Sequence, residues 1–215
     1  MKKASPKLRP GTVVVDCTSG HPQHTQKIAK WLKADHDVEF LDCAVSGGPG
    51  GARKGTLASF VGGNDDATVK QMVPIIETFS QHIVHLGPVG AGHAVKAINN
   101  AMNVSNLLCA TEGLLALRKL GIDPTRACAV INKSSGRSLM SEVRVPQDVL
   151  SGWFNYGFKL GLMQKDVNIA VDLLDEHFPD STVIRFPCHP ETPKVLTHTH
   201  DGKEHPEADR GVAGA

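Results

Sequence analysis

The chain of 215 residues is 40% hydrophobic and carries 23 Lys and Arg against 22 Asp and Glu, a formal net charge of +1. This length and composition provide a sizeable core in one large or two small domains, and the evenly mixed charges exclude a basic nucleic-acid footprint. No apolar run approaches the ~20 residues of a membrane span, and the basic start lacks the apolar core of a signal peptide. We expect a cytoplasmic protein that binds neither nucleic acid nor membrane, with a mitochondrial location left open.

The first part of the chain alternates strand and helix patterns. Residues 1–10 form a basic, proline-punctuated lead-in. The sequence then predicts strands over 12–17, 38–45, 56–61 and 82–86, and helices over 22–34 and 66–80. Alternation of this kind is typical of an α/β layer.

The pattern becomes entirely helical after the glycines of residues 87–92. Apolar residues recur at helical spacing from 93 to about 120, which predicts one helix on the order of 40 Å long that crosses a domain boundary. Further helices are predicted over 124–132, 141–150 and 159–177. Residues 178–215 are rich in proline and poor in apolar residues, so we expect a disordered tail.

The opening of the long helix holds the first candidate chemistry. Lys96 and Asn100 stand four residues apart and therefore share one helix face. A lysine whose pKa is lowered by partial burial can transfer protons, and an amide can hydrogen-bond a substrate hydroxyl. Taken alone, this pair is better explained as a solvated surface charge and a helix-capping amide.

A second motif favours the catalytic interpretation of this pair. An apolar strand ends in Ser46, Gly47 and Gly48, where we expect a loop whose hydroxyl and backbone N–H groups can bind an anionic oxygen. The alternative is an ordinary glycine-rich turn. A P-loop is rejected because the order that follows is Lys54-Gly55-Thr56 rather than Gly-Lys-Thr.

Together these segments resemble the β-hydroxyacid dehydrogenase family, which includes 3-hydroxyisobutyrate dehydrogenase and tartronate semialdehyde reductase. Residues 15–22 look like the family's Asp-x-Ser-Thr-x-x-Pro turn, and Lys165-Asp166-Val167 looks like its late Lys-Asp-Leu. The four motifs occur in family order over roughly three quarters of the chain.

The resemblance implies a role for each matched position on the substrate side. Lys96 would be the general acid/base, and Asn100 would orient the substrate hydroxyl. The carboxylate of a small anionic hydroxyacid or semialdehyde would be held by Ser46, Gly47 and Gly48.

It also implies a cofactor side, with NAD or NADP as the cofactor. Thr18 and Ser19 would contact the nicotinamide ribose, and Ser19 stands where the family has threonine. Lys165 would close the site from a distant helix, near both cofactor and substrate.

The implied fold class is α/β: the C-terminal part of a Rossmann-type NAD(P)-binding domain over 1–91, an all-helical domain over 92–177 built on the long interdomain helix, and a divergent tail over 178–215. Family members open with a Gly-x-Gly-x-x-Gly turn that this sequence lacks, so we expect an N-terminally truncated chain without the residue that selects NAD or NADP. The helical domain implies a homo-oligomer.

Two functions follow as alternatives. The first is an NAD(P)-dependent oxidoreductase that interconverts a short hydroxyacid and its semialdehyde or ketone. The second is a catalytically inactive remnant that acts as an oligomerisation or interaction module.

The remaining candidate residues are cysteines and histidines. The five cysteines are odd in number and widely spaced, so we interpret them as reduced. For Cys17 and Cys43, at strand ends near the proposed site, packing is favoured over a reactive role. His198, His200 and His205 invite a metal site, but incidental histidines explain them better, and we expect no metal.

Overall fold

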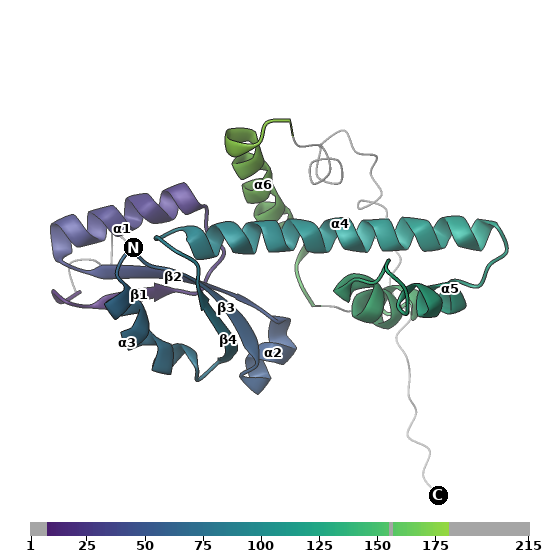
Figure 1. The fold of residues 1–215 in the computed structure, drawn as a ribbon, viewed down its shortest axis with the longest axis horizontal. Helices are drawn as coiled ribbons and strands as arrows, with labels where there is room; N and C mark the ends of the chain where they lie inside the picture. Colours follow the sequence, from purple (N-terminus) through teal and green to yellow (C-terminus); the bar gives the residue numbers. More distant parts are fainter. Residues whose placement is uncertain (1–7, 155–156, 181–215) are drawn as a thin grey trace, which may run out of the picture.

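The computed structural model describes residues 8–154 and 157–180 of the chain (Figure 1). Its four strands form one sheet in the order β1-β2-β3-β4. They are β1 (Val13–Asp16), β2 (Glu39–Ser46), β3 (Leu57–Gly62) and β4 (Ser80–His85). Each lies within two residues of its predicted bounds, so the predicted α/β fold class is confirmed.

The sheet is mixed rather than all parallel. β2 pairs in parallel with β1 and antiparallel with β3, which in turn pairs in parallel with β4. The connection between β2 and β3, residues 47–56, is too short for a parallel crossover, which needs a dozen or more residues. It contains the short helix α2 (Gly48–Lys54), where the sequence predicted only a loop.

Two helices cover opposite faces of the sheet (Figure 1). α1 (Pro22–His36) packs through Leu32 on the face that holds Phe40, and α3 (Asp66–Ile76) packs through Ile76 on the face that holds Leu41. Consecutive strand residues serve opposite faces, as the pleat of a strand requires.

α3 is shorter than predicted. Thr78 and Phe79 donate their backbone N–H groups to Ile75 and Ile76 in tight turns, which ends the helix. Ser80, expected at the end of this helix, belongs to β4 instead and lies 2.6 Å, oxygen to oxygen, from Ser59.

A single long helix, α4 (Ala91–Lys119), joins the sheet to the remaining helices, as predicted (Figure 1). Its first turns pack on β2 and β3, and its far end packs on α5 (Pro124–Ile131) and on η2 (Met140–Leu150), a wide π-type helix. Leu114, Cys128 and Val145 form part of the core between these elements.

α6 (Leu160–His177) crosses α4 near the sheet. Small residues of α4, Ala97 and Ala101, meet Ile169 and Ala170 there, which lets the two helices approach closely. Among the described residues, no helix is long and apolar enough to cross a membrane. All but three residues of the predicted disordered tail lie outside the described part of the chain.

Candidate functional site

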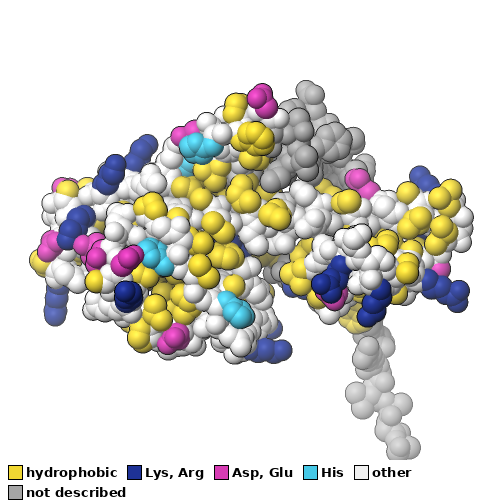
Figure 2. All heavy atoms as spheres, in the orientation of Figure 1, with side chains coloured by type: hydrophobic (Ala, Val, Ile, Leu, Met, Phe, Trp, Pro, Cys, Tyr) yellow, Lys and Arg dark blue, Asp and Glu magenta, His cyan; other side chains and the backbone are white. Residues whose placement is uncertain are grey.

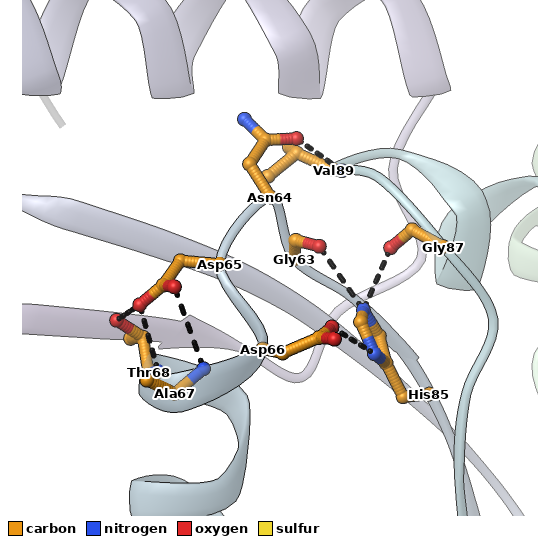
Figure 3. Close-up of polar contacts among 9 residues, drawn as sticks. All are labelled: Gly63, Asn64, Asp65, Asp66, Ala67, Thr68, His85, Gly87 and Val89. Atoms are coloured by element: carbon orange, nitrogen blue, oxygen red, sulfur yellow. Dashed lines mark hydrogen bonds and ion pairs between the residues drawn. The ribbon is translucent and has the colours of Figure 1, made fainter.

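A network of polar contacts fixes the glycine turn that leads into α4 (Figure 3). The backbone N–H of Val89 donates to the Asn64 side chain at 3.0 Å, and the N–H of Gly63 donates to the carbonyl of Gly87 at 2.9 Å. The His85 ring places Nε2 3.0 Å from both glycine carbonyl oxygens. The turn is therefore tied to the end of β3.

The same network reaches the start of α3. Nδ1 of His85 lies 3.2 Å from the Asp66 carboxylate (Figure 3). Asp65 caps the helix by accepting hydrogen bonds from the backbone N–H groups of Ala67 and Thr68, and from the Thr68 hydroxyl. These bonds lower the pKa of Asp65.

Asp42 anchors the first turn of α4 to the sheet. This fully buried strand residue accepts hydrogen bonds from the backbone N–H of Gly90 at 2.7 Å and from that of His93 at 2.8 Å. A carboxylate is stabilised at the positive end of a helix and satisfies N–H groups that have no partner within the helix. Sequence reasoning missed Asp42, although an acid inside an apolar strand is itself a signal of a buried partner.

Gly92 lets the helix approach the sheet closely. A Cβ at this position would lie 2.2 Å from the carbonyl oxygen of Phe60 and 3.0 Å from that of Asp42. Any larger residue would push α4 off the sheet, so glycine is required here for space.

His93 connects α4 to the start of α1. Its side chain is buried, with Nδ1 2.7 Å from the Thr25 hydroxyl, and it packs against Gly20 in the turn before α1. Nε2 of His93 has no hydrogen-bond partner among the described residues. The turn that holds Thr18 and Ser19 is thus fixed against the start of α4.

Lys96 lies one turn further along α4 and is half-buried. Burial lowers the pKa of its ammonium, and the nearby Asp166 carboxylate partly opposes that shift. Within the described part of the chain, no side chain forms a hydrogen bond or ion pair with Lys96.

Asn100 and Asp166 form a buried polar pair beside Lys96. The Asn100 amide Nδ2 donates to Asp166 Oδ2 at 2.6 Å, and the other carboxylate oxygen lies 3.0 Å from Lys165 Nζ. Both Asn100 and Asp166 are at least 96% buried. The sequence motif contained Asp166, but its role was missed because the partner lies on another helix.

Two side chains of α6 bind the N-terminal end of α1, one at the turn before it and one in its first turn. Lys165 Nζ donates to the carbonyl of Ser19, and Glu176 accepts from the Gln23 amide at 2.5 Å. The turn that holds Ser19 therefore lies directly against α6. The hydroxyls of Thr18 and Ser19 make no hydrogen bond within the described residues.

The glycine-rich segment after β2 lies apart from these contacts. Ser46 ends β2, Gly47 caps α2 with φ 134°, and Gly48 opens that helix with φ 64°. No hydrogen bond joins these three residues to Lys96 or Asn100 in the described structure. The structure connects Lys96, Asn100 and Lys165 through Asp166, and Ser19 through Lys165, whereas no hydrogen bond or ion pair within the described residues joins Ser46, Gly47, Gly48 or Thr18 to this group.

No group of three or more His, Cys, Asp or Glu side chains is placed to hold a metal ion in residues 8–154 and 157–180. His198, His200 and His205 lie outside the described residues.

Both parts of the chain match models of known dehydrogenase domains. Residues 1–87 match the NAD binding domain of 6-phosphogluconate dehydrogenase, and residues 90–180 match the NAD-binding domain of NADP-dependent 3-hydroxyisobutyrate dehydrogenase. The chain belongs to the β-hydroxyacid dehydrogenase family, as its motifs predicted.

Two curated relatives are a dehydrogenase and a reductase. The chain is 37% identical to 2-(hydroxymethyl)glutarate dehydrogenase of Eubacterium barkeri, over 75% of this chain and 53% of the relative. It is 35% identical to 2-hydroxy-3-oxopropionate reductase of Escherichia coli, over 75% and 54% respectively. It thus spans about half the length of the curated relatives it matches.

A solved structure gives the same picture of the fold. Mycobacterium tuberculosis 3-hydroxyisobutyrate dehydrogenase, determined with L-serine, superposes with a TM-score of 0.79 at 26% identity. The match covers 87% of this chain and 66% of that protein.

Proposed function

We propose that this chain is part of an NAD(P)-dependent oxidoreductase of the 3-hydroxyisobutyrate dehydrogenase type, with Lys96 as its general acid/base. The observation that carries the proposal is a half-buried lysine of lowered pKa, with no direct partner among the described residues, beside the buried Asn100–Asp166 pair. A structural lysine would be paired or solvated. A lysine in this environment is suited to proton transfer.

In the reduction direction, the Lys96 ammonium donates a proton to the carbonyl oxygen of the substrate. Asp166 accepts from one N–H of Asn100, which fixes the amide plane and leaves its other N–H for the substrate oxygen. The negative charge of Asp166 prevents the Lys96 pKa from falling further. The ammonium is therefore still available as an acid.

The residues around Ser19 fit the nicotinamide end of NAD or NADP, which supplies the hydride when bound. The support is that the Thr18 and Ser19 hydroxyls have no partner in the described structure, while Lys165 is positioned over the Ser19 carbonyl. These three residues would hold the ribose side. On the substrate side, Ser46, Gly47 and Gly48 would bind the carboxylate through a hydroxyl and backbone N–H groups, which agrees with the acids named for two relatives.

The domain division and assembly are proposals of the same kind. α4 begins at Ala91, and the two family matches end at 87 and begin at 90, which supports a boundary near residue 91.

Charged side chains of both signs are interspersed over the face shown in Figure 2, with no single-sign patch. Exposed apolar residues on the helical part, such as Met102, Leu115, Val130 and Leu139, support a homo-oligomer formed through it. We propose a cytoplasmic location, with a mitochondrial one, as for two of the relatives, as the alternative.

The test is steady-state reduction of short semialdehydes with NADH and NADPH. The chain would be fused at its N-terminus to the Gly-x-Gly-x-x-Gly segment of the Escherichia coli relative. Lys96→Ala should lower turnover on the order of 10²–10⁴-fold with cofactor binding largely retained, because a positioned general acid is lost. Lys165→Ala should instead weaken cofactor binding as well.

Near-normal turnover of Lys96→Ala across neutral pH would transfer the acid/base role to Lys165. A fused protein that binds cofactor, self-associates and turns over none of these substrates would favour the alternative, an oligomerisation module.

A further inference from the structure

One cysteine directly follows β1 and another lies on the neighbouring strand β2. In the register of β1 and β2, Val15 pairs with Leu41 and Asp16 pairs with Asp42. Continuing this register by one residue would put Cys17 opposite Cys43, which lies on the sheet face that packs on α3.

The spacing suits a disulfide. Neighbouring strands lie about 4.8 Å apart, which falls within the range of roughly 4.4–6.8 Å between the Cα atoms of disulfide-bonded cysteines. Side chains at opposed positions of a parallel pair point to the same face, so this register directs both thiols to one side of the sheet. Each thiol shifts the pKa of the other, which supports their proximity.

The two thiols differ in exposure and in pKa. Cys17 is exposed, and the hydrogen bond from Cys43 lowers its pKa from 9.0 to about 7, against the opposing effects of burial and Asp16. Cys43 is fully buried, and its hydrogen bond to Cys17 together with burial raises its pKa. Cys17 is therefore the thiolate that reacts first, and Cys43 remains a thiol at its side.

We propose that Cys17 and Cys43 form a reversible disulfide, an oxidation site directly before the Thr18–Ser19 turn. The Cys17 thiolate attacks one oxygen of hydrogen peroxide and breaks the O–O bond, giving Cys17 sulfenic acid and hydroxide, which is protonated to one water. The Cys43 sulfur then attacks the Cys17 sulfur, forms the S–S bond and releases a second water, so two thiols are oxidised by two electrons as one peroxide is reduced. Any effect of this bond on catalysis rests on the proposed function, but the bond itself does not.

Peptide mapping of the oxidised chain tests the bond. A full-length chain with Cys188→Ser, treated with a few equivalents of hydrogen peroxide and digested with trypsin without reductant, should give the peptides 8–27 and 34–53 linked, and dithiothreitol should separate them. Cys109, which is also exposed, serves as the internal control and should stay unlinked. Oxidation of Cys17 to sulfinic acid with Cys43 still a thiol would overturn the proposal.

Alkylation rates test the pairing without oxidation. At pH 7 a pKa near 7 instead of 9.0 raises the thiolate fraction about 50-fold, and the lower nucleophilicity of the weaker base reduces this to roughly five- to eightfold in rate. Cys43→Ala removes the donor and should slow iodoacetamide labelling of Cys17 by that factor, while Cys43→Ser, which keeps a donor, should slow it less. Equal labelling of Cys17 in all three proteins would contradict the pairing.

Cys17, the exposed member of the pair, can be replaced without disturbing the core. Cys17→Ser should fold normally and abolish the linked peptide. A linked peptide that persists in Cys17→Ser, formed through Cys43 and another cysteine, would also overturn the proposal.

Discussion

Asp42 and His93 stand 51 residues apart in the chain and meet in the core, where the Asp42 carboxylate accepts the His93 backbone N–H at 2.8 Å. Gly62 makes room for this contact, because a Cβ at that position would lie 2.4 Å from the same carboxylate. A strand acid thus determines where the longest helix begins and, through it, where Lys96 lies.

Replacing this carboxylate by an amide should lower the free energy of unfolding. Asp42→Asn leaves an NH₂ group facing backbone N–H donors, and we expect a loss of about 2–3 kcal/mol in the free energy of unfolding, measured by urea denaturation. Asp65→Asn, the same change at the exposed cap of α3, should alter stability little because asparagine caps helices as well as aspartate does. Equal losses in the two variants would show that burial of the acceptor is not what matters.

Two glycines of α4 should respond to alanine in opposite directions. Gly92→Ala puts a methyl group 2.2 Å from the Phe60 carbonyl oxygen, so α4 must shift and the protein should be destabilised. Gly113→Ala meets nothing within 4 Å and should stabilise the helix by about 0.5–1 kcal/mol. Thermal unfolding followed by circular dichroism separates the two, and stabilisation by Gly92→Ala would contradict the close approach.

Lys96 should make stability depend on pH in the alkaline range. Its pKa in the folded protein lies below the 10.5 of an unperturbed lysine, so between those values the unfolded chain binds more protons and the free energy of unfolding rises with pH. Lys96→Met should therefore be more stable than the wild-type chain by the largest margin at neutral pH. That margin should shrink as the pH approaches 10.5, and a margin independent of pH would show that burial of the charge has no part in it.

Dinucleotide binding by the 215-residue chain should be weak. The sequence contains no Gly-x-Gly-x-x-Gly segment to place a pyrophosphate at a helix N-terminus, and in the proposed site the residues near Ser19 would contact only the nicotinamide end. Calorimetric titration with NADH and NADPH should give dissociation constants well above the micromolar range. Low-micromolar binding would show that the strand ends and the turn before α1 are enough to bind the dinucleotide.

Sequence periodicity predicted the regular elements well because their causes are local. β3 largely alternates in burial, β2 is an apolar run that is buried through its middle, and apolar residues recur at helical spacing along α4. α2 was missed because its composition of glycine, proline and basic residues opposes a helix, and it forms between two glycines, Gly47 and Gly55, that have positive φ angles.

The polar core of the candidate site was less predictable. The four-residue spacing of Lys96 and Asn100 correctly put them on one face, but their partner Asp166 comes from a helix that crosses 66 residues later. Asp42 was missed for the same reason. Cys43 is buried as predicted, whereas Cys17, for which packing was favoured, is exposed because β1 ends one residue before it.

Because α4 is long, a small change in its tilt produces a large displacement at its far end. Its 29 residues span about 43 Å, so a tilt of only about 5° around its anchored first turn would move its far end by roughly 4 Å. Conversely, the contacts of α4 with α5 and η2 limit the angle at which the helix leaves the sheet. Lys96 lies close to the anchored turn, so such a tilt would displace the helical part of the chain while leaving the lysine almost in place.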